Sequence, residues 1–330
     1  CNNLTFLYET MIAEKVGLGY MREIVEIREI KGLLGEIPDP PQVLYAQGNT
    51  ELLFRDDFFF LCIVGPRKAS QYGKEVVKLI IEHLAQFKVI TVSGAAYGID
   101  GLVHTYSIHN QIPTIAVPGS GINDESFYPR AHLDLKHEII ENQGLVTSEF
   151  HPLAVAGPWT FPIRNRIMAG MTHLTIVVEA EKKSGTLITA HLAVDYNRDV
   201  LAVPGSIFSP TSQGTLELIS KGAEIFLNVN TLTESILRLA KILNINPWKT
   251  NTLTKEIDTL QTLPLFNENH LNETERKVFK CIQDSLDGID KDELKRQLRL
   301  SISVISICIS LLELLDLVAI QEGKIKTKKI

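Results

Sequence analysis

The sequence predicts an α/β fold, an extended Rossmann-like, doubly wound and mostly parallel sheet, with a small C-terminal winged-helix domain. Between about residues 46 and 228, short runs rich in β-branched residues alternate with helical stretches. This alternation is typical of a parallel sheet covered by helices on both faces. Beyond residue 269, three stretches of helical periodicity and one hairpin pattern follow a polar segment, and they indicate the second domain.

The predicted strands of residues 46–228 are apolar runs between turn residues. They are Phe58–Val64, Val89–Ser93, Thr114–Val117, Leu145–Glu149, Leu174–Glu179 and Val200–Val203, with Ile225–Val229 as a candidate edge strand. Nearly every run ends at glycine or proline followed by a small polar residue. In open α/β sheets, ligands bind outside the carboxyl ends of the strands, where helix N-termini offer free N–H groups to anions. We therefore expect the binding site at this edge.

The remaining parts of the chain differ in composition. Residues 1–45 have mixed charge and predict a shortened N-terminal helical module, whereas residues 229–268 predict a linker with a helix near 234–243. Residues 269–330 predict a winged helix with helices at 273–284, 290–298 and 302–316 and a hairpin at 318–326. Its third helix has no Arg or Lys to contact a major groove, which favours an accessory or protein-contact role. The basic segment 324–329 is a candidate phosphate contact.

Cysteine usage and charge restrict the class of protein. The four cysteines show no C-x-x-C spacing and lie mostly in apolar stretches, which favours reduced thiols and a cytoplasmic location. Cys1 in place of an initiating Met is interpreted as a truncation rather than a lipid anchor. No apolar run has the length of a membrane span. The net charge of −6 does not exclude nucleic acid, because local arginines set phosphate affinity.

Three loops after predicted strands carry candidate anion-binding residues. In the first loop, glycine allows a tight turn, an arginine lies at the carboxyl edge of the sheet and a serine can cap the next helix. In the second, two glycines flank a nest of backbone N–H groups that can hold a phosphate oxygen. The candidates are Gly65, Arg67, Ser70, Gly94, Gly98 and Arg130. For the first loop, a plain turn with a solvated arginine is the alternative.

Residues 161–170 contain the densest group of polar candidates. Three of its residues fall on one helical face, namely Ile163, Ile167 and Gly170. This arrangement leaves Arg164, Asn165 and Arg166 free for polar contacts at a helix start, where a guanidinium can bind phosphate and stack on a base. For Arg166, an ion pair with Glu179 or Asp195 that braces the sheet is the alternative.

The loop before the next apolar helix is the last candidate. It consists of Lys182, Lys183, Ser184, Gly185 and Thr186, in which Ser184 can cap the helix. The free N–H groups of that helix then point outward as an anion site. The alternative for the two lysines is a solvated charge run.

Taken together, these segments resemble the DNA-processing protein A family, also called DprA or Smf. The resemblance spans residues 38 to 226 and rests on five motifs in the family's order. They are Gly65-x-Arg67 with Ser70-x-Tyr72-Gly73, Ser93-Gly94 with Gly98-Ile99-Asp100 and His104, Tyr128-Pro129, Phe161-Pro162-x-Arg164-Asn165-Arg166-Ile167, and Ser184-Gly185-Thr186-Leu187-Ile188-Thr189-Ala190.

The resemblance implies an extended Rossmann fold that binds single-stranded DNA, forms homodimers and helps the RecA recombinase load on DNA during natural transformation. The chain departs from the family at two positions of the expected groove. Tyr97 stands where many members have Arg, and Pro66 stands where Ser or Thr is usual.

Two other functions remain as alternatives. A Rossmann-type nucleotide phosphoribohydrolase would carry an unbroken P-G-G-x-G-T-x-x-E, but here Pro204-Gly205 is separated from Gly214-Thr215-Leu216-Glu217 by eight residues. A transcription regulator would act through the winged helix on duplex DNA. No Walker loop, G-x-S-x-G, H-E-x-x-H or zinc spacing is present, so we expect no catalytic residue, cofactor or metal.

Overall fold

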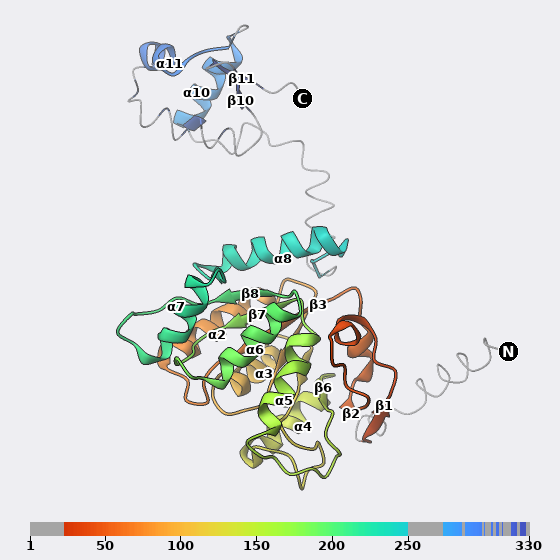
Figure 1. Cartoon of the computed structure of the whole chain (residues 1–330). Helices are drawn as coiled ribbons and strands as arrows, with labels where there is room; N and C mark the ends of the chain where they lie inside the picture. The colour runs from red at the N-terminus through yellow and green to blue at the C-terminus, as the bar shows by residue number, and fades with distance from the viewer. Residues whose placement is uncertain are drawn as a thin grey trace, which may run out of the picture. The chain divides into compact units, whose positions relative to one another are not determined.

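A computed structural model describes residues 23–249, 273–285, 288–298 and 300, together with 305, 308–309, 312, 318–321 and 324–327 (Figure 1). The chain divides into two compact units, Cys1–Lys249 and Thr250–Ile330.

The first unit is built on one twisted sheet. Its described strands lie in the order β1-β2-β6-β5-β4-β3-β7-β8-β9, in which β1 and β2 are antiparallel additions to a parallel sheet. Their bounds are β1 Val25–Ile27, β2 Leu44–Gly48, β3 Phe59–Val64, β4 Val89–Ser93, β5 Thr114–Ala116, β6 Leu145–Ser148, β7 Leu174–Val177, β8 Asp199–Ala202 and β9 Glu224–Ile225. The mixed α/β class and the mostly parallel sheet are confirmed.

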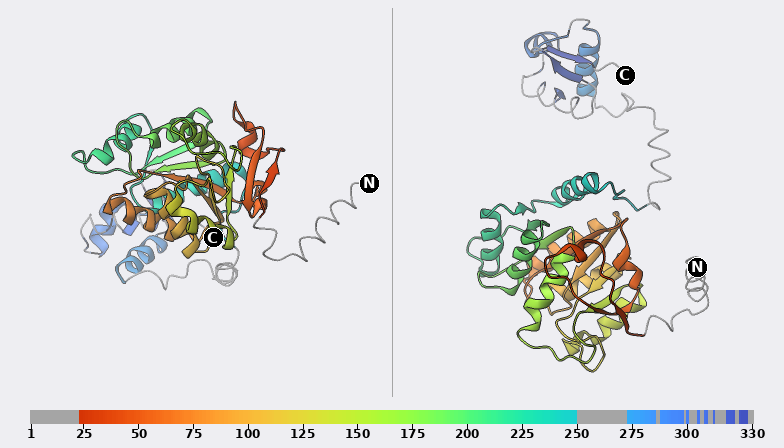
Figure 2. Two further views of the ribbon diagram at one scale, coloured as in Figure 1. Left: turned by 90° about the horizontal axis from the view of Figure 1, so that it is seen from below. Right: turned by 45° about the vertical axis from the view of Figure 1, so that its right-hand side comes forward.

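Helices cover both faces of this sheet (Figure 2). They are α2 Gln71–Leu84, α3 Ile99–His109, α4 Leu133–Glu141, α5 Thr160–Gly170, α6 Gly185–Asp195, α7 Gln213–Ser220 and α8 Val229–Leu243. Short 3-10 turns lie at η2 Gly32–Glu36, η3 Thr50–Phe54, η4 Arg130–His132 and η5 Pro210–Ser212.

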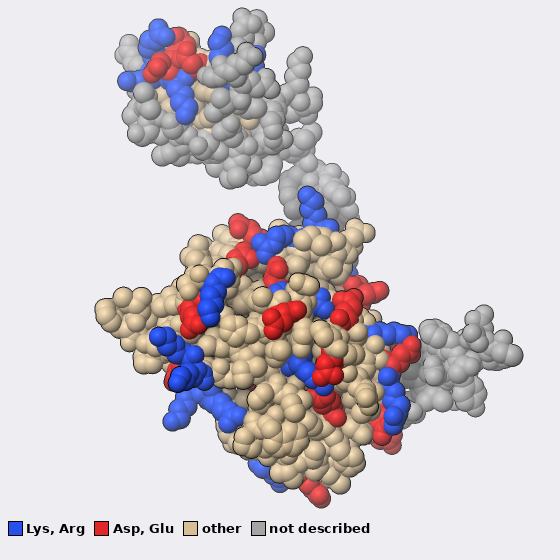
Figure 3. All heavy atoms as spheres, in the orientation of Figure 1, with Lys and Arg blue, Asp and Glu red and all other residues tan. Residues whose placement is uncertain are grey.

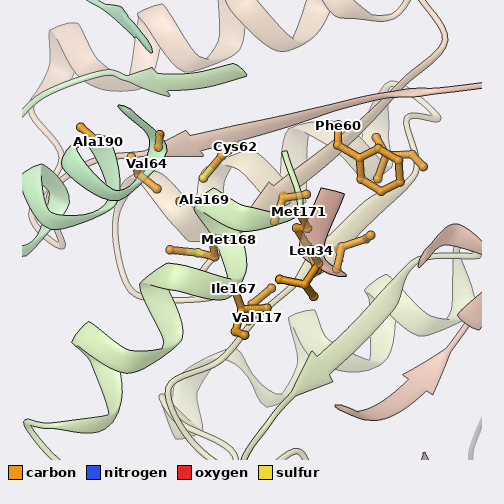
Figure 4. Packing of buried hydrophobic residues seen from close by; sticks show 14 of the residues in the cluster. Leu34, Phe60, Cys62, Val64, Val117, Ile167, Met168, Ala169, Met171 and Ala190 are labelled. Atoms are coloured by element: carbon orange, nitrogen blue, oxygen red, sulfur yellow. The ribbon is translucent and has the colours of Figure 1, made fainter. Parts of the chain in front are cut away.

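The central strand β3 is buried along its whole length because its two faces enter different cores. Phe59, Leu61 and Ile63 pack with the apolar residues of α2, α3 and α8. Cys62 and Val64 point to the opposite side and pack with α5 and α6, as Figure 4 shows for Met168, Ala169 and Ala190. A strand covered on both faces has no polar side, and this explains the continuous apolar run in the sequence.

Strand positions agree with the prediction to within one or two residues, with one exception. The edge strand expected at Ile225–Val229 is limited to β9, because the side chain of Asn228 accepts hydrogen bonds from the N–H groups of Asn230 and Thr231 and begins α8.

The predicted helical character of residues 1–45 is wrong for the described part, residues 23–45. Val25–Ile27 instead pairs antiparallel with Leu44–Ala46. In β2, Leu44 and Ala46 are buried while Tyr45 is only half-buried, which is the alternation of a strand with one face on a core. This segment therefore belongs to the sheet rather than to a separate module.

The predicted linker beginning at residue 229 is also partly wrong. Residues Leu232, Ile236 and Ala240 of α8 are buried against the same core as α2. Their i, i+4, i+8 spacing places them on one helical face, so α8 belongs to the first unit.

The second unit contains two of the predicted helices and the predicted hairpin. They are α10 Glu273–Gln283, α11 Lys291–Leu298 and the antiparallel pair β10 Val318–Gln321 and β11 Lys324–Thr327. Val278, Ile282, Leu294 and Ile325 share its buried core. Most of the predicted third helix, 302–316, and Lys328 and Lys329 lie outside the described residues, so the winged helix stays a prediction. Within the described part of the chain, no helix combines the length and apolar character needed to cross a bilayer.

Two histidines in the first unit are held neutral by burial. His104 is fully buried, its Nδ1 lies 2.8 Å from the Thr114 hydroxyl, and burial lowers its pKa to about 3. His173 accepts a hydrogen bond from the Phe60 N–H at 3.0 Å through Nδ1, and burial lowers its pKa to about 4. Both side chains take up protons more readily in the unfolded chain.

Acidification from pH 7 to pH 5 is therefore expected to lower the free energy of unfolding of the first unit. Histidine has a pKa near 6.5 in unfolded chains, so each group contributes about 2 kcal/mol to the loss as the unfolded state becomes protonated. Urea unfolding followed by tryptophan fluorescence measures it, because both tryptophans, Trp159 and Trp248, lie in this unit. His173→Asn should lose roughly half of the pH dependence, and an unchanged dependence would contradict the assignment.

Candidate nucleic-acid interface

Two adjoining clefts lie at the carboxyl ends of the parallel strands. The first has a volume of about 490 Å³ and is lined by the loops after β3, β4 and β7 and by α5. The second has a volume of about 530 Å³ and is lined by α5, α6, residues 156–158 and Tyr128. Four residues line both clefts, namely Arg67, Phe161, Asn165 and Gly185. Each helix that follows a parallel strand begins at this edge of the sheet, and α2, α3 and α6 follow the strands whose loops line the first cleft.

The N-terminus of α2 is closed by a carboxylate of the protein itself. Ser70 caps the helix as predicted, because its Oγ accepts a hydrogen bond from the Gly73 N–H at 3.0 Å. The same hydroxyl donates to Glu179 Oε1 at 2.6 Å, and the Ser70 N–H donates to Glu179 Oε2 at 3.1 Å. Glu179 is 2% exposed. Its carboxylate therefore occupies the place that a phosphate would take at this helix.

The predicted nest at the start of α3 is closed in the same way. Asp100, buried in the first turn of α3, accepts hydrogen bonds from the N–H groups of Gly94 and Ala96, while its burial raises its pKa. Gly98 has φ +75°, and a Cβ there would overlap the Pro66 carbonyl oxygen, so this turn requires glycine. Gly94 and Gly98 thus shape the loop, and the N–H groups of Gly94 and Ala96 are satisfied internally.

Arg164 is a buried brace, not the free guanidinium that the helical face predicted. It is 5% exposed, and its Nη1 donates to the carbonyl of Gly94 at 2.6 Å and to the carbonyl of Val117. Burial lowers its pKa, and the carboxylate of Asp100 opposes that shift. The prediction failed because Ile163, expected on the inner face of α5, is 38% exposed. The guanidinium instead joins the ends of β4 and β5 to α5.

The other two polar candidates of α5 also have partners inside the protein. Asn165 is 6% exposed and donates to the Gly185 carbonyl at 3.3 Å. Arg166 forms an ion pair with Glu149 and donates to the carbonyl of Asp39 at 2.9 Å. The predicted alternative of a bracing ion pair is therefore observed, although with Glu149 and Asp39 in place of Glu179 or Asp195.

The N-terminus of α6 is open. Ser184 caps it as predicted, accepting a hydrogen bond from the Thr186 N–H at 3.2 Å, and Thr186 lines the first cleft. Gly185 is exposed, lines both clefts and has no atom within 4 Å of the place where a Cβ would lie. Among the described residues no carboxylate is bonded to the first N–H groups of α6, whereas Glu179 accepts a hydrogen bond from Ser70, the N-cap residue of α2.

Cations surround this open helix start. Arg67 is exposed, and its guanidinium carbon lies 4.7 Å from the centre of the Phe161 ring. Lys68, Lys182 and Lys183 are also exposed, and none of these four cations forms an ion pair with a described residue. A helix N-terminus beside unpaired cations favours an anion.

Arg130 lines neither cleft. It lies in η4 and donates through Nη1 to the carbonyl of Asp124, which turns its side chain back onto the preceding loop. The expectation that Arg130 reaches the same rim is therefore not met.

Aromatic rings near the arginine were missed as contact residues. The rings of Tyr128 and Phe161 meet edge to face with centres 5.8 Å apart, and both residues line the second cleft. Tyr97 is 40% exposed and packs edge to face on His132 with ring centres 5.1 Å apart. The signal available in the sequence was an aromatic residue directly after a strand-end turn, as at Tyr97.

Comparisons with known proteins place the chain in a family. The family model described as DNA recombination-mediator protein A matches residues 26–237. The chain is 38% identical over 203 residues to the DNA processing protein DprA of Bacillus subtilis, covering 62% of this chain and 67% of that protein. It is 41% identical over 192 residues to DprA of Streptococcus pneumoniae, covering 58% and 66%. With protein Smf of Escherichia coli it shares 38% identity over 199 residues, which cover 60% and 52%.

Two solved structures agree with this assignment. The X-ray structure of DprA from Streptococcus pneumoniae superposes with a TM-score of 0.59 and 32% identity, covering 71% of this chain and 82% of that one. DNA processing protein A of Helicobacter pylori, whose structure describes a single-stranded DNA binding mode, superposes with a TM-score of 0.59 and 26% identity, covering 66% and 97%. The resemblance found in the sequence is thereby confirmed, and the chain belongs to the DNA recombination-mediator protein A family.

Proposed function

We propose that the chain binds single-stranded DNA and acts as a DNA-processing protein in transformation and recombination. The observation that carries this proposal is the open start of α6 beside Arg67, whose guanidinium is stacked on Phe161 where the two clefts meet. Family membership and the single-stranded DNA binding described for the Helicobacter pylori relative support it.

The arrangement separates the two components of a nucleotide. The first cleft offers Arg67, Lys68 and the N-terminus of α6, which suit a phosphate. The second offers Tyr128, Phe161 and Ile188, which suit the face of a base. Because paired bases in a duplex have their faces covered by stacking neighbours, access to aromatic rings in a cleft favours a single strand.

The same edge supports a binding role rather than catalysis. The glutamate that a phosphoribohydrolase would use corresponds to Glu217, which is bonded to Lys221 at 2.6 Å on an accessible side of α7. Glu217 lines neither cleft. We therefore include the absence of enzymatic activity in the proposal, and a phosphoribohydrolase assay with nucleoside monophosphates tests it.

We extend the proposal to RecA as a protein partner, as the family resemblance implies. The DNA clefts lie on the first unit, and the family model covers most of that unit. An assembly assay with purified RecA on single-stranded DNA, with and without this protein, tests that part of the proposal.

Purified protein is expected to bind single-stranded DNA more tightly than duplex DNA of the same length, with little sequence preference. Each phosphate neutralised should add roughly 0.7 to the slope of log affinity against log salt. Fluorescence anisotropy with a labelled oligonucleotide and its duplex across a salt series measures both quantities. Equal or tighter duplex binding would favour a duplex-binding regulator instead.

Arg67→Ala is expected to weaken single-strand binding by roughly 1.5 to 3 kcal/mol, the scale of a charge-assisted hydrogen bond, and to lower the salt slope by about one contact. Folding should be unaffected because the side chain is exposed. Arg130→Ala is the matched control, since it removes the same charge from an exposed site outside both clefts. Equal losses in the two variants would show a general charge effect and contradict the assignment.

We further propose that the chain forms a homodimer through α8. One face of α8 is anchored to the core, but the helix also carries exposed apolar residues, namely Leu237 at 40%, Ile242 at 71% and Leu243 at 39%.

The double variant Leu237→Glu, Ile242→Glu is expected to shift the protein from dimer to monomer in sedimentation equilibrium. Leu153→Glu, at another exposed apolar residue, should leave the dimer intact. A monomeric wild-type protein would refute the proposal.

A further inference from the structure

The connection between β8 and α7 projects from the carboxyl edge of the sheet, at the left of Figure 1. Two adjacent apolar residues lie within it. Ile207 is 70% exposed and Phe208 is 88% exposed, the highest value of any large apolar side chain among the described residues. Neither residue lines the two clefts or has a role in the site described above. Single exposed apolar residues are ordinary, whereas an adjacent pair on a projecting connection indicates a contact surface.

The connection is held by hydrogen bonds at both ends and in its middle. At its start the Pro204 carbonyl accepts a hydrogen bond from the Tyr72 hydroxyl at 2.8 Å. At the centre the Phe208 N–H donates to Ser206 Oγ at 3.2 Å, and the Ser209 N–H donates to the Ser206 carbonyl at 2.9 Å. The two apolar side chains are thus presented on an ordered backbone, so a contact there costs little additional ordering of the chain.

The end of the connection is bonded to the segment that leads to the open helix start. The Ala180 N–H donates to the Thr211 carbonyl at 2.7 Å, and the Gly214 N–H donates to the Ala180 carbonyl at 2.8 Å. Ala180 lies two residues before Lys182 and three before Lys183, and both lysines are exposed and without an ion pair to a described residue. Figure 3 agrees, because Lys and Arg side chains lie next to an uncharged projection on the left of the molecule.

We propose that Ile207 and Phe208 form a second contact for single-stranded DNA, in which Phe208 stacks on an unpaired base outside the two clefts. This inference rests on the proposed single-strand binding and extends it to a defined surface. The partner must combine an anionic backbone with flat apolar faces. This follows because the β8–α7 connection presents the aromatic ring, and the β7–α6 connection bonded to it presents unpaired lysines. Unpaired nucleotides have both properties, whereas the apolar centre of a protein interface is generally depleted of lysine.

The test compares Phe208→Ala with Phe54→Ala in the full chain. Phe54 is a matched control because it is also an exposed phenylalanine, at 50%, but lies in η3 before the amino end of β3. The probes are a labelled oligothymidylate and an abasic oligonucleotide of equal length and charge, measured by anisotropy at one salt concentration. Melting curves for each variant verify folding.

Stacking of one base is worth roughly 1 to 3 kcal/mol, which corresponds to a 5- to 150-fold change in affinity. Phe208→Ala is therefore expected to weaken oligothymidylate binding at least 5-fold while leaving abasic binding unchanged, and Phe54→Ala should change neither.

Wild-type-like affinity of Phe208→Ala for oligothymidylate would overturn the inference and leave the proposed function intact. If that variant instead loses self-association in sedimentation, the surface contacts a second copy, and the inference is also overturned. Failure of the wild-type protein to bind oligothymidylate would refute the proposed function itself.

Discussion

The geometry of the binding edge depends on a buried arginine, Arg164, whose charge is balanced by a buried carboxylate and by backbone carbonyls. Arg164 and Asp100 both pack against Gly94, where a Cβ would overlap the guanidinium and approach Asp100 Oδ2 to 2.6 Å. A buried cation is tolerable only when hydrogen bonds and an opposite charge replace its water, and the carbonyls of Gly94 and Val117 together with Asp100 supply these. Because the same guanidinium bonds the ends of two strands, the positions of the loops after β4 and β5 relative to α5 depend on it.

Internal carboxylates occupy N–H groups at two places of this edge that could otherwise bind an external anion. Glu179 closes the start of α2, and Asp100 closes the N–H groups of Gly94 and Ala96 in the loop before α3. Both places would otherwise offer N–H groups to a phosphate, as the start of α6 does. The start of α6 has no such carboxylate, and it lies in the first cleft, which Arg67 and Lys68 also line. In the proposed site, buried acids therefore limit where an anion can bind, in addition to the attraction by exposed bases.

Local features of this edge could be predicted from the sequence. The caps at Ser70 and Ser184 depend on contacts two or three residues away, and both were predicted correctly. The strands were predictable because burial on two faces leaves a continuous apolar run. The three-residue strand β1 was not, since so short a segment carries almost no periodicity.

Long-range features could not be predicted in this way. The role of Glu179 depends on Ser70, which is 109 residues distant in the chain. The orientation of α5 was equally inaccessible, because Ile163 and Arg164 are neighbours and either could face inward. The carbonyls that make a buried arginine favourable belong to other loops, and only the assembled sheet brings them together.

Few unpaired Lys and Arg side chains are available at this edge to contact the phosphates of single-stranded DNA. Arg67, Lys68, Lys182 and Lys183 are the unpaired cations identified at this edge, and the protein as a whole carries a net charge of −6. Four phosphate contacts would give a salt slope of only about 3, so counterion release would contribute only a small part of the affinity at physiological salt. Contacts that do not depend on salt must therefore supply a large share of the free energy of binding.

Phe161 and Tyr128 are placed for such contacts, because their rings line a cleft beside the proposed phosphate position. Stacking on several rings is also tolerant of sequence, since every base has a π face, and this agrees with a groove that lacks a base-reading helix.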